Sequence, residues 1–259
     1  MSNKKVIYSA MTGGYDDIQD VNAPDGWDCI MFTDLQEEER PKNSGWNFIT
    51  IDMHRGKDNS FVNRWYKMHP HILFPKYDES IYIDANIKVK NFTFIDDRVM
   101  LLQKKKSHIS MPEHFGRDCI YEEGKAILTC KMDTKSKLDK TIKLLKKEGY
   151  PEHNGLYENN FIYRKHNEKE IVGLMNQWWQ FINKYSRRDQ MSLCYLLWKN
   201  KVKSECFFNQ GLSVRKHKDF QFIKRHKGSV HNVRGIKRNL IKILCLFVPV
   251  KLWRSKLRG

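Results

Sequence analysis

The sequence predicts an α/β fold, a mixed central sheet flanked by helices, followed by a basic amphipathic tail. Runs rich in β-branched and aromatic residues dominate the first half of the chain, and apolar residues at helical spacing dominate the second. Early strands and late helices with mixed connections are typical of a layered α/β domain. No internal repeat or linker divides it, so we expect one domain over residues 1–230 and a tail over residues 231–259.

Six segments have the composition of strands: 5–10, 28–33, 47–51, 80–83, 126–130 and 160–163. Four segments have helical patterns: 60–69, 137–148, 167–184 and 186–199. Pro70 ends the first of these, and Gly149 with Pro151 ends the second. The third and fourth open with Asn-x-x-Glu and Ser-x-x-Asp, which resemble helix caps.

Positive charge is concentrated toward the C-terminus. The chain carries 47 Lys and Arg against 30 Asp and Glu, and residues 220–259 contain 11 of the basic groups and no acid. In residues 236–259 these groups alternate with large apolar side chains, which favours an anionic membrane surface over a nucleic acid as partner. The longest uncharged stretch there has eight residues, 243–250, whereas a span needs roughly 20. We therefore expect the tail to lie on a membrane without crossing it.

The six cysteines include no C-x-x-C pair and several lie in apolar runs, which suits reduced core thiols. The first residues lack the apolar stretch of a secretory signal. These features predict a cytoplasmic protein, and the tail predicts a peripheral position on the inner face of the cytoplasmic membrane.

The segment Ile81-Tyr82-Ile83-Asp84-Ala85-Asn86 brings hard oxygen ligands to the end of an apolar strand. On an extended chain Asp84 and Asn86 would point to the same side. Such ligands suit Mg²⁺ or Mn²⁺, which neutralises a diphosphate. An ordinary polar turn after a strand is the alternative for this tripeptide alone.

Basic residues precede this strand. Arg64 and Lys67 are three apart and share a face if residues 60–69 are helical, and His71 follows Pro70. We expect Arg64, Lys67 and His71 to lie on the side of the site that binds the diphosphate of a sugar donor, because a guanidinium and an ammonium bind phosphates. A solvated cationic face is the alternative.

Six blocks in a fixed order carry a family resemblance: YSAMTGGYD (8–16), FTD (32–34), RWYKMHPH (64–71), YIDAN (82–86), HFGRDCIYEE (114–123) and RDQMS (188–192). Over roughly residues 5–230 the chain resembles domain-of-unknown-function family 616. That glycosyltransferase-like family includes plant cell-wall and bacterial surface-polysaccharide proteins and is distantly similar to glycosyltransferase family 8.

The resemblance implies a GT-A fold with a nucleotide-sugar donor. Ala10, Thr12 and Tyr15 would line the base and ribose pocket, and Asp84 and Asn86 would occupy the D-x-D position. Asn86 replaces the second aspartate of that motif, which removes one charge and leaves open whether a metal is obligatory.

GT-A enzymes commonly take a further metal ligand from a C-terminal histidine. Among His217, His226 and His231 we place His226 first. A partly exposed histidine in a basic loop is the alternative, and no spacing resembles a zinc site.

The catalytic residues depend on the stereochemistry, which the sequence leaves open. Asp189 is either the last member of a helix cap or an acceptor-side acid in the RDQMS block. An inverting enzyme needs a base, for which Asp189, Glu158 and Asp118 are candidates. A retaining enzyme needs a carbonyl or carboxylate near the anomeric carbon, which Gln190 or Asn159 provides.

The sequence therefore predicts a metal-dependent glycosyltransferase that moves a sugar, UDP-linked or similar, to a glycan or lipid-linked acceptor. The bacterial members of the family point to synthesis of capsule, O-antigen or lipopolysaccharide. One alternative is a metal-dependent nucleotidyltransferase or phosphodiesterase, for which Asp96 and Asp97 are the available second acidic pair. The other is a non-enzymatic basic adaptor for a membrane or nucleic acid. Trp178 could form a sugar platform, but its helical spacing favours the core.

Overall fold

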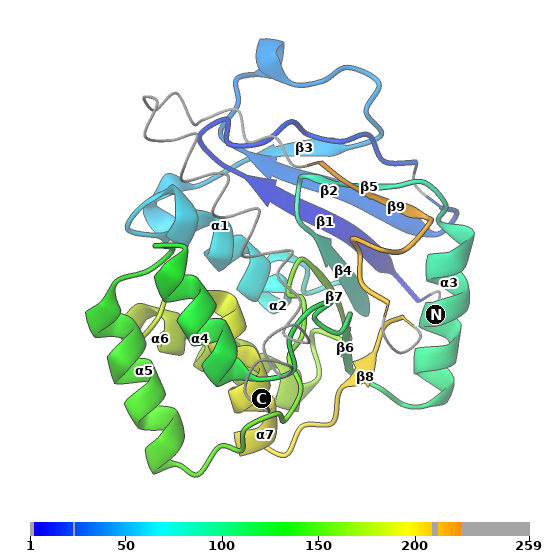
Figure 1. Cartoon of the computed structure of the whole chain (residues 1–259). Coiled ribbons are helices and arrows are strands. Elements are labelled where there is room, and N and C mark those ends of the chain that lie inside the picture. Colours follow the sequence, from blue (N-terminus) through cyan, green and yellow to red (C-terminus); the bar gives the residue numbers. More distant parts are fainter. Residues whose placement is uncertain (1–2, 23, 209–211, 224–259) are drawn as a thin grey trace.

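The computed structural model describes residues 3–22, 24–208 and 212–223 and contains a seven-stranded mixed sheet (Figure 1). The strand order is β3-β2-β1-β4-β7-β6-β8. The strands are β1 (Lys5–Met11), β2 (Trp27–Thr33), β3 (Asn47–Thr50), β4 (Glu79–Ile83), β6 (Ile109–Met111), β7 (Phe161–Arg164) and β8 (Glu205–Cys206). Strands β1 to β4 are parallel, β7 is antiparallel to both β4 and β6, and β8 is parallel to β6. The expected mixed central sheet is confirmed.

Helices cover both faces of this sheet (Figure 1). One face packs against α1 (Asn59–Met68), α2 (Pro70–Leu73), α4 (Ile120–Thr129), α5 (Lys135–Lys147), α6 (Lys169–Lys184) and α7 (Leu193–Lys199). The other carries α3 (Thr93–Lys104) and the antiparallel ribbon of β5 (Ile87–Val89) and β9 (Phe220–Phe222). Alternation along β1 sends Tyr8 to the first core and Ile7 to the second, and both are fully buried. The expected α/β architecture, a mixed central sheet flanked by helices, is thereby confirmed in its layers.

The order of the strands reverses at β1. The chain runs outward from β1 through β2 to β3, returns through α1 and α2, and adds β4 on the other side of β1. Ligands of open α/β sheets bind at such a switch point, in the crevice outside the carboxyl ends of the strands. The loop after β1 and the turn after β4 meet this crevice.

One predicted strand is wrong. Residues 126–130 belong to α4, which buries Ile120, Tyr121 and Ile127 at helical spacing. The short apolar run at its end does not distinguish a strand from a buried helix by itself, and the full helical period only appears when the preceding residues are included.

The two predicted helix caps are also wrong, because tertiary partners take the capping side chains. The Asn167 side chain donates to the Tyr77 carbonyl at 2.8 Å, and α6 begins after Glu168. The Ser186 hydroxyl donates to Asp133 at 2.7 Å, and Asp189 opens a short 3-10 helix, Asp189–Met191. Helix α3, strands β6 and β8 and the β5–β9 ribbon were not expected from the sequence.

Several predictions concern residues outside the described ranges: His226, the boundary at residue 230 and the basic tail. Within the described ranges, no helix is long and apolar enough to cross a membrane. The five cysteines in those ranges, Cys29, Cys119, Cys130, Cys194 and Cys206, are free thiols.

Two buried histidines should make the fold sensitive to acid. Burial lowers the pKa of His69 and His166 to about 4, while their rings bond the carbonyls of Trp65 and Phe74. Because the unfolded chain binds these protons near pH 6.5, the free energy of unfolding should fall as the pH drops from 6.5 toward 4. The loss should reach roughly 2 kcal/mol per histidine at pH 5.

Urea denaturation at pH 7.5 and pH 5.0 measures this loss. His166→Gln, which retains a donor for the Phe74 carbonyl, should show a smaller drop between the two pH values than the wild type. The exposed His54 provides the matched control, and His54→Gln should leave the drop unchanged. An equal drop in wild type and His166→Gln would contradict this account.

Candidate functional site

The loop after β1 forms one wall of the crevice. Gly13 has a φ of +66°, and a Cβ there would lie 2.3 Å from the side-chain nitrogen Nδ2 of Asn59. The Gly13 N–H donates to Asp34 at 2.8 Å, and the Thr12 hydroxyl donates to the Asn59 carbonyl at 3.0 Å. Glycine is favoured here because its positive φ strains other residues, and a Cβ would in addition displace the Asn59 side chain. Ala10, buried on β1, receives a bond from Asn63 of the same helix.

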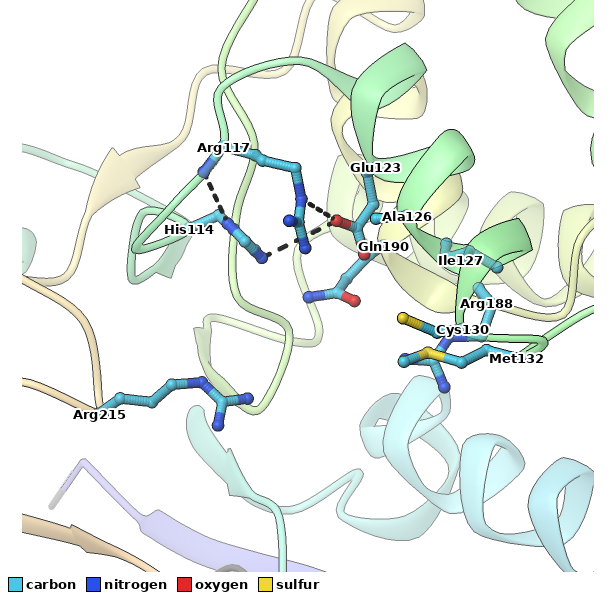
Figure 2. Close-up of a pocket in the computed structure, with 10 residues that line it drawn as sticks. All are labelled: His114, Arg117, Glu123, Ala126, Ile127, Cys130, Met132, Arg188, Gln190 and Arg215. Carbon is cyan, nitrogen blue, oxygen red and sulfur yellow. Dashed lines mark hydrogen bonds and ion pairs between the residues drawn. The ribbon is translucent and has the colours of Figure 1, made fainter. Parts of the chain in front are cut away.

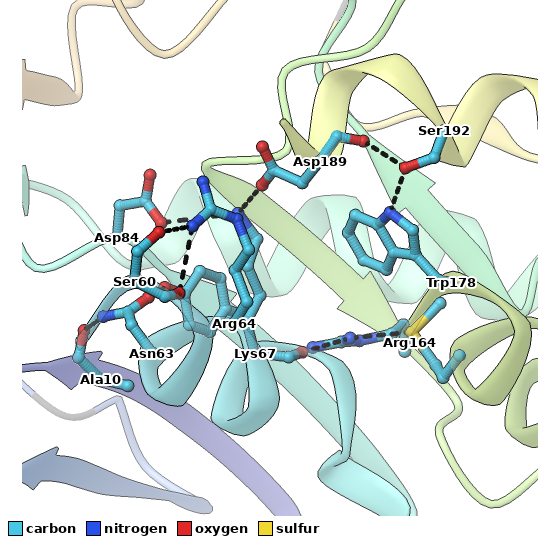
Figure 3. Close-up of polar contacts among 12 residues, drawn as sticks. Ala10, Ser60, Asn63, Arg64, Lys67, Asp84, Arg164, Trp178, Asp189 and Ser192 are labelled. Carbon is cyan, nitrogen blue, oxygen red and sulfur yellow. Dashed lines mark hydrogen bonds and ion pairs between the residues drawn. The ribbon is translucent and has the colours of Figure 1, made fainter. Parts of the chain in front are cut away.

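Helix α1 presents Arg64 and Lys67 to the crevice from one face, as expected from their spacing (Figure 3). The Lys67 ammonium lies 2.7 Å from a carboxylate oxygen of Asp189 and 3.7 Å from one of Asp84. Its side chain is only 5% exposed, so these two carboxylates provide most of its compensation. Arg64 is anchored by Ser60 one turn earlier.

The backbone of Lys67 is held by side chains from the central sheet. Its carbonyl accepts from the Tyr8 hydroxyl at 3.0 Å and from the Arg164 guanidinium at 2.8 Å. Arg164 also donates to Tyr8 at 2.5 Å, and it is fully buried. Neither residue was predicted as functional. In the sequence, each is a polar residue within an apolar strand segment. Such a residue indicates a buried hydrogen-bond network but does not identify the residue that it bonds.

The two carboxylates beside Lys67 have opposite electrostatic character. Burial raises the pKa of Asp189, but Lys67, Arg64 and Arg188 outweigh it and hold that pKa well below its usual range. For Asp84 burial dominates and raises the pKa, with Lys67 opposing and Asp189 adding to the rise. Asp189 is therefore held in its charged form by its ion pair with Lys67. The charged form of Asp84 is less well compensated, so a further cation beside it would stabilise that form.

The structure rules out one of the two interpretations of Asp189, the helix cap. It does not cap a helix with Ser186, and its side chain instead points into the crevice at Lys67 (Figure 3). Trp178 is fully buried and donates to the Ser192 hydroxyl at 2.9 Å, so its assignment to the core is confirmed.

Asp84 lies in a turn, which corrects the extended geometry expected for this segment. The Asp84 carbonyl accepts from the Ile87 N–H at 3.0 Å, so Asp84 to Ile87 reverse direction after β4. The Asp84 N–H donates to the Asn160 carbonyl at 2.9 Å, which brings the start of β7 beside the turn.

Buried polar atoms without hydrogen-bond partners surround this turn. Within the described ranges they include the side-chain oxygen of Asn86 and both side-chain polar atoms of Asn159. Leaving such atoms unpaired costs on the order of 1–3 kcal/mol each, which favours a ligand that pairs them here. The Asp84 carboxylate, 38% exposed, and the Asn86 oxygen fit a hard divalent cation whose remaining ligands are water and phosphate. In the described ranges no group of three or more His, Cys, Asp or Glu side chains forms a complete metal site.

Other candidates lie at different distances from this cluster. Tyr15 is half-exposed on the loop after β1 and interacts electrostatically with Arg64 and Arg188, so it borders the crevice. His71 lies on α2, which leads into the amino end of β4, away from the turn at Asp84. Asp118 is exposed and pairs with His153 at 2.8 Å. The structure thus brings Tyr15 to the cluster and leaves His71 and Asp118 outside it.

Glu158 and Gln190 lie near a cavity next to the crevice. Gln190 lines the cavity, and Glu158, which is 2% exposed, lies 3.4 Å from the lining residue Arg215. Burial raises the pKa of Glu158, and Arg215 opposes this rise. His217, the one late histidine in the described ranges, is buried between Phe94 and Phe208 and is not turned to this site.

Lys67 should be essential for stability as well as for the site. Lys67→Met leaves Asp189 buried without its cation and should lower the free energy of unfolding by about 3 kcal/mol, the lower end of the range for a broken buried pair because Asp84 stays partly exposed. Asp189→Asn in the Lys67→Met background should restore part of the loss. Denaturant unfolding at pH 7.5 measures both, with the exposed Lys76→Met as control. A Lys67→Met protein as stable as wild type would contradict the assignment.

Comparison with solved structures finds glycosyltransferases that are similar to this chain at low identity. Mouse xyloside xylosyltransferase 1 has 8% identity and a TM-score of 0.46, covering 78% of this chain and 84% of its own. The S. cerevisiae mannosyltransferase Ktr4p in complex with GDP has 14% identity and a TM-score of 0.48, and the match covers 79% of this chain and 69% of Ktr4p. The galactosyltransferase LgtC, in complex with donor and acceptor sugar analogs, has 11% identity and a TM-score of 0.45, covering 97% and 99%.

No curated protein sequence matches the chain. The family comparison is specific: residues 29–226, which include Arg64, Lys67, Asp84 and Asp189, match the TOD1/MUCI70 glycosyltransferase-like domain. This match covers most of the chain and is named neither for family 616 nor for glycosyltransferase family 8. The chain belongs to the TOD1/MUCI70 family of glycosyltransferase-like domains.

Proposed function

We propose that this chain transfers a sugar from a UDP-linked donor to a glycan or lipid-linked acceptor with the help of Mn²⁺ or Mg²⁺. The observation that carries the proposal is the position of Asp84, Lys67 and Asp189 together at the switch point of the sheet. In a glycosyltransferase-like domain, that crevice is where a nucleotide is expected. A distant relation to glycosyltransferase family 8 is part of the same proposal.

The donor diphosphate would lie on the exposed side of Asp84, next to α1, because Lys67 is only 3.7 Å from Asp84 and leaves no space between the two side chains. Asp84 and Asn86 would hold the metal, with His226 as a third protein ligand. When bound, the metal neutralises the charge that develops on the leaving diphosphate. Arg64 and Lys67 supply fixed positive charge on the same side. Because Lys67 is already paired with Asp189, its position is set before the donor arrives.

The nucleoside would lie along the loop after β1. Tyr15 offers an exposed ring for the base, while Ala10 and Thr12 shape the floor below it. The Thr12 hydroxyl is used within the protein, so its contribution is to hold α1 against the loop rather than to contact the donor.

The acid–base roles follow from the charges. A general base works best when its pKa lies near the working pH, and Asp189 in its ion pair with Lys67 is far below it. Glu158 is buried with a raised pKa and is the stronger candidate for proton transfer in an inverting reaction. Gln190, next to Asp189 and lining the cavity, is the candidate for the anomeric side in a retaining reaction.

The structure disfavours the nucleotidyltransferase alternative. Two-metal phosphoryl transfer needs a second acidic group about 4 Å from the first metal. Asp96 instead bonds Trp27 at 2.7 Å and lies 3.8 Å from Lys5, so it sits at the amino ends of β1 and β2. A non-enzymatic adaptor would give no role to the buried ion pair or to the unpaired polar atoms around Asp84.

The biological setting belongs to the proposal as well. We place the enzyme in the synthesis of a bacterial surface polysaccharide such as capsule, O-antigen or lipopolysaccharide. It would act in the cytoplasm on the inner face of the membrane, held there by the basic tail.

Asp84→Asn should separate activity from stability. Sugar transfer should fall at least about 100-fold, because metal charge stabilisation contributes several kcal/mol. The melting temperature should not fall, because the neutral amide removes a carboxylate whose charged form is disfavoured by burial. Nucleotide release from a panel of nucleotide sugars with Mn²⁺ measures sugar transfer, and thermal unfolding measures the melting temperature.

Asp96→Asn is the matched control and should retain transfer. Full activity in a folded Asp84→Asn protein would overturn the assigned donor site. Loss of activity in Asp96→Asn with retention in Asp84→Asn would favour phosphoryl chemistry elsewhere.

Deletion of residues 236–259 should release the protein from membranes. The seven Lys and Arg of this segment each contribute on the order of 1 kcal/mol at an anionic surface, and salt weakens the attraction. Full-length protein should sediment with anionic vesicles at low salt, and the truncated protein should not, while it still acts on a soluble acceptor. Unfolding of the truncated protein, or no vesicle binding by the full chain, would assign the segment a structural role.

A further inference from the structure

A small cavity beside the crevice is lined by an excess of positive charge (Figure 2). Its volume is about 70 Å³, and its polar lining residues are His114, Arg117, Glu123, Arg188, Gln190 and Arg215. The guanidinium groups come from three distant parts of the chain. A cavity of this size holds several water-sized groups, enough for a carboxylate or a phosphate group.

Two of the three arginines have a carboxylate partner. Arg117 lies 2.6 Å from Glu123, and Arg215 lies 3.4 Å from Glu158. For Arg188 the described part of the chain provides no ion pair, and its Nε is buried without a hydrogen-bond partner. The cavity therefore has one guanidinium more than it has carboxylates.

His114 does not change this balance. Its Nδ1 accepts from the N–H groups of Gly116 and Arg117 at 3.2 and 3.0 Å, so the proton resides on Nε2. Burial, with Arg117 and Arg215 adding to it, lowers the pKa of His114 to about 3. The ring is neutral near pH 7, and its role is to fix the loop that aims Arg117 at Glu123. The positive charge of the cavity therefore comes from its arginines alone.

The cavity adjoins the proposed reaction centre. Arg188 and Gln190 line it from the two sides of Asp189, and Asp189 is bonded to Lys67. Arg188 also acts electrostatically on both Asp189 and Arg64. An anionic group bound in the cavity would thus hold the rest of its molecule near the donor's sugar.

We infer that the acceptor carries an anionic group, a sugar carboxylate or a sugar phosphate, which Arg188 binds in this cavity together with Arg117 and Arg215. Guanidinium groups bind both anions through paired hydrogen bonds, so the chemistry is shared. This inference rests on the proposed glycosyltransferase function and adds the class of acceptor. Arg188 is partly buried and its Nε has no hydrogen-bond partner in the described part of the chain, and an anion in the cavity would supply one.

Calorimetric titration of the full chain, saturated with UDP and Mn²⁺, tests this inference. The probes are methyl β-D-glucuronide, glucose 6-phosphate and the neutral methyl β-D-glucoside. At least one anionic probe should bind about tenfold more tightly than the glucoside, which corresponds to one good charge-assisted contact. The comparison between the two anionic probes identifies the carboxylate or the phosphate as the preferred group.

Arg188→Gln should abolish the preference without changing UDP affinity. Arg187→Gln is the matched control, because Arg187 is the adjacent arginine and pairs with Asp58 at 3.3 Å outside the cavity. Equal binding of all three probes, or binding of none to a protein that binds UDP, would overturn the inference. The inference would also be overturned if UDP displaced the anionic probes, or if Arg188→Gln lowered the affinity for UDP. Either result would show that the cavity binds the donor and not the acceptor. Failure to bind UDP, with the anion preference intact, would instead refute the proposed function.

Discussion

The buried ammonium of Lys67 is the constraint on which the site depends. Desolvating an ammonium costs several kcal/mol unless carboxylates and hydrogen bonds compensate for it. Asp84 from the turn after β4 and Asp189 from the segment before α7 provide the charges. Tyr8 and Arg164, from β1 and β7, hold the carbonyl of the same residue. Three strands and a distant loop are thereby tied to a single residue of α1, through its side chain and its backbone carbonyl.

This arrangement gives the two carboxylates different tasks. Asp189 is held at 2.7 Å by Lys67, so it is fixed in place and only weakly basic. Asp84 is farther from the ammonium and partly exposed, so it still has capacity for a cation. The unpaired atoms of Asn86 and Asn159 lie around it. A crevice with a fixed ion pair on one side and unsatisfied polar groups on the other is organised to receive a charged ligand rather than to complete the fold.

The positive charge of the chain has two distinct distributions. Within the described ranges, much of it lies on exposed lysines, where water and salt weaken its effect. A small part lies in the cavity formed by Arg117, Arg188 and Arg215, where low exposure strengthens each interaction. The net charge of +17 therefore says little about the site. The local excess of one guanidinium next to Asp189 is what selects a partner.

The sequence by itself determined strands β1 to β4 and β7, four of the helices and the position of Asp84 at the end of a strand, because strand composition and apolar period are local properties. It also placed Arg64 and Lys67 on one face, since their spacing fixes that in a helix. It misassigned residues 126–130 and the cap at Ser186, where local patterns are ambiguous. Only the tertiary structure joined Lys67 to Asp189, 122 residues away, and gathered the arginines of the cavity. Such pairings depend on how strands order in the sheet, and burial then decides which charges need partners.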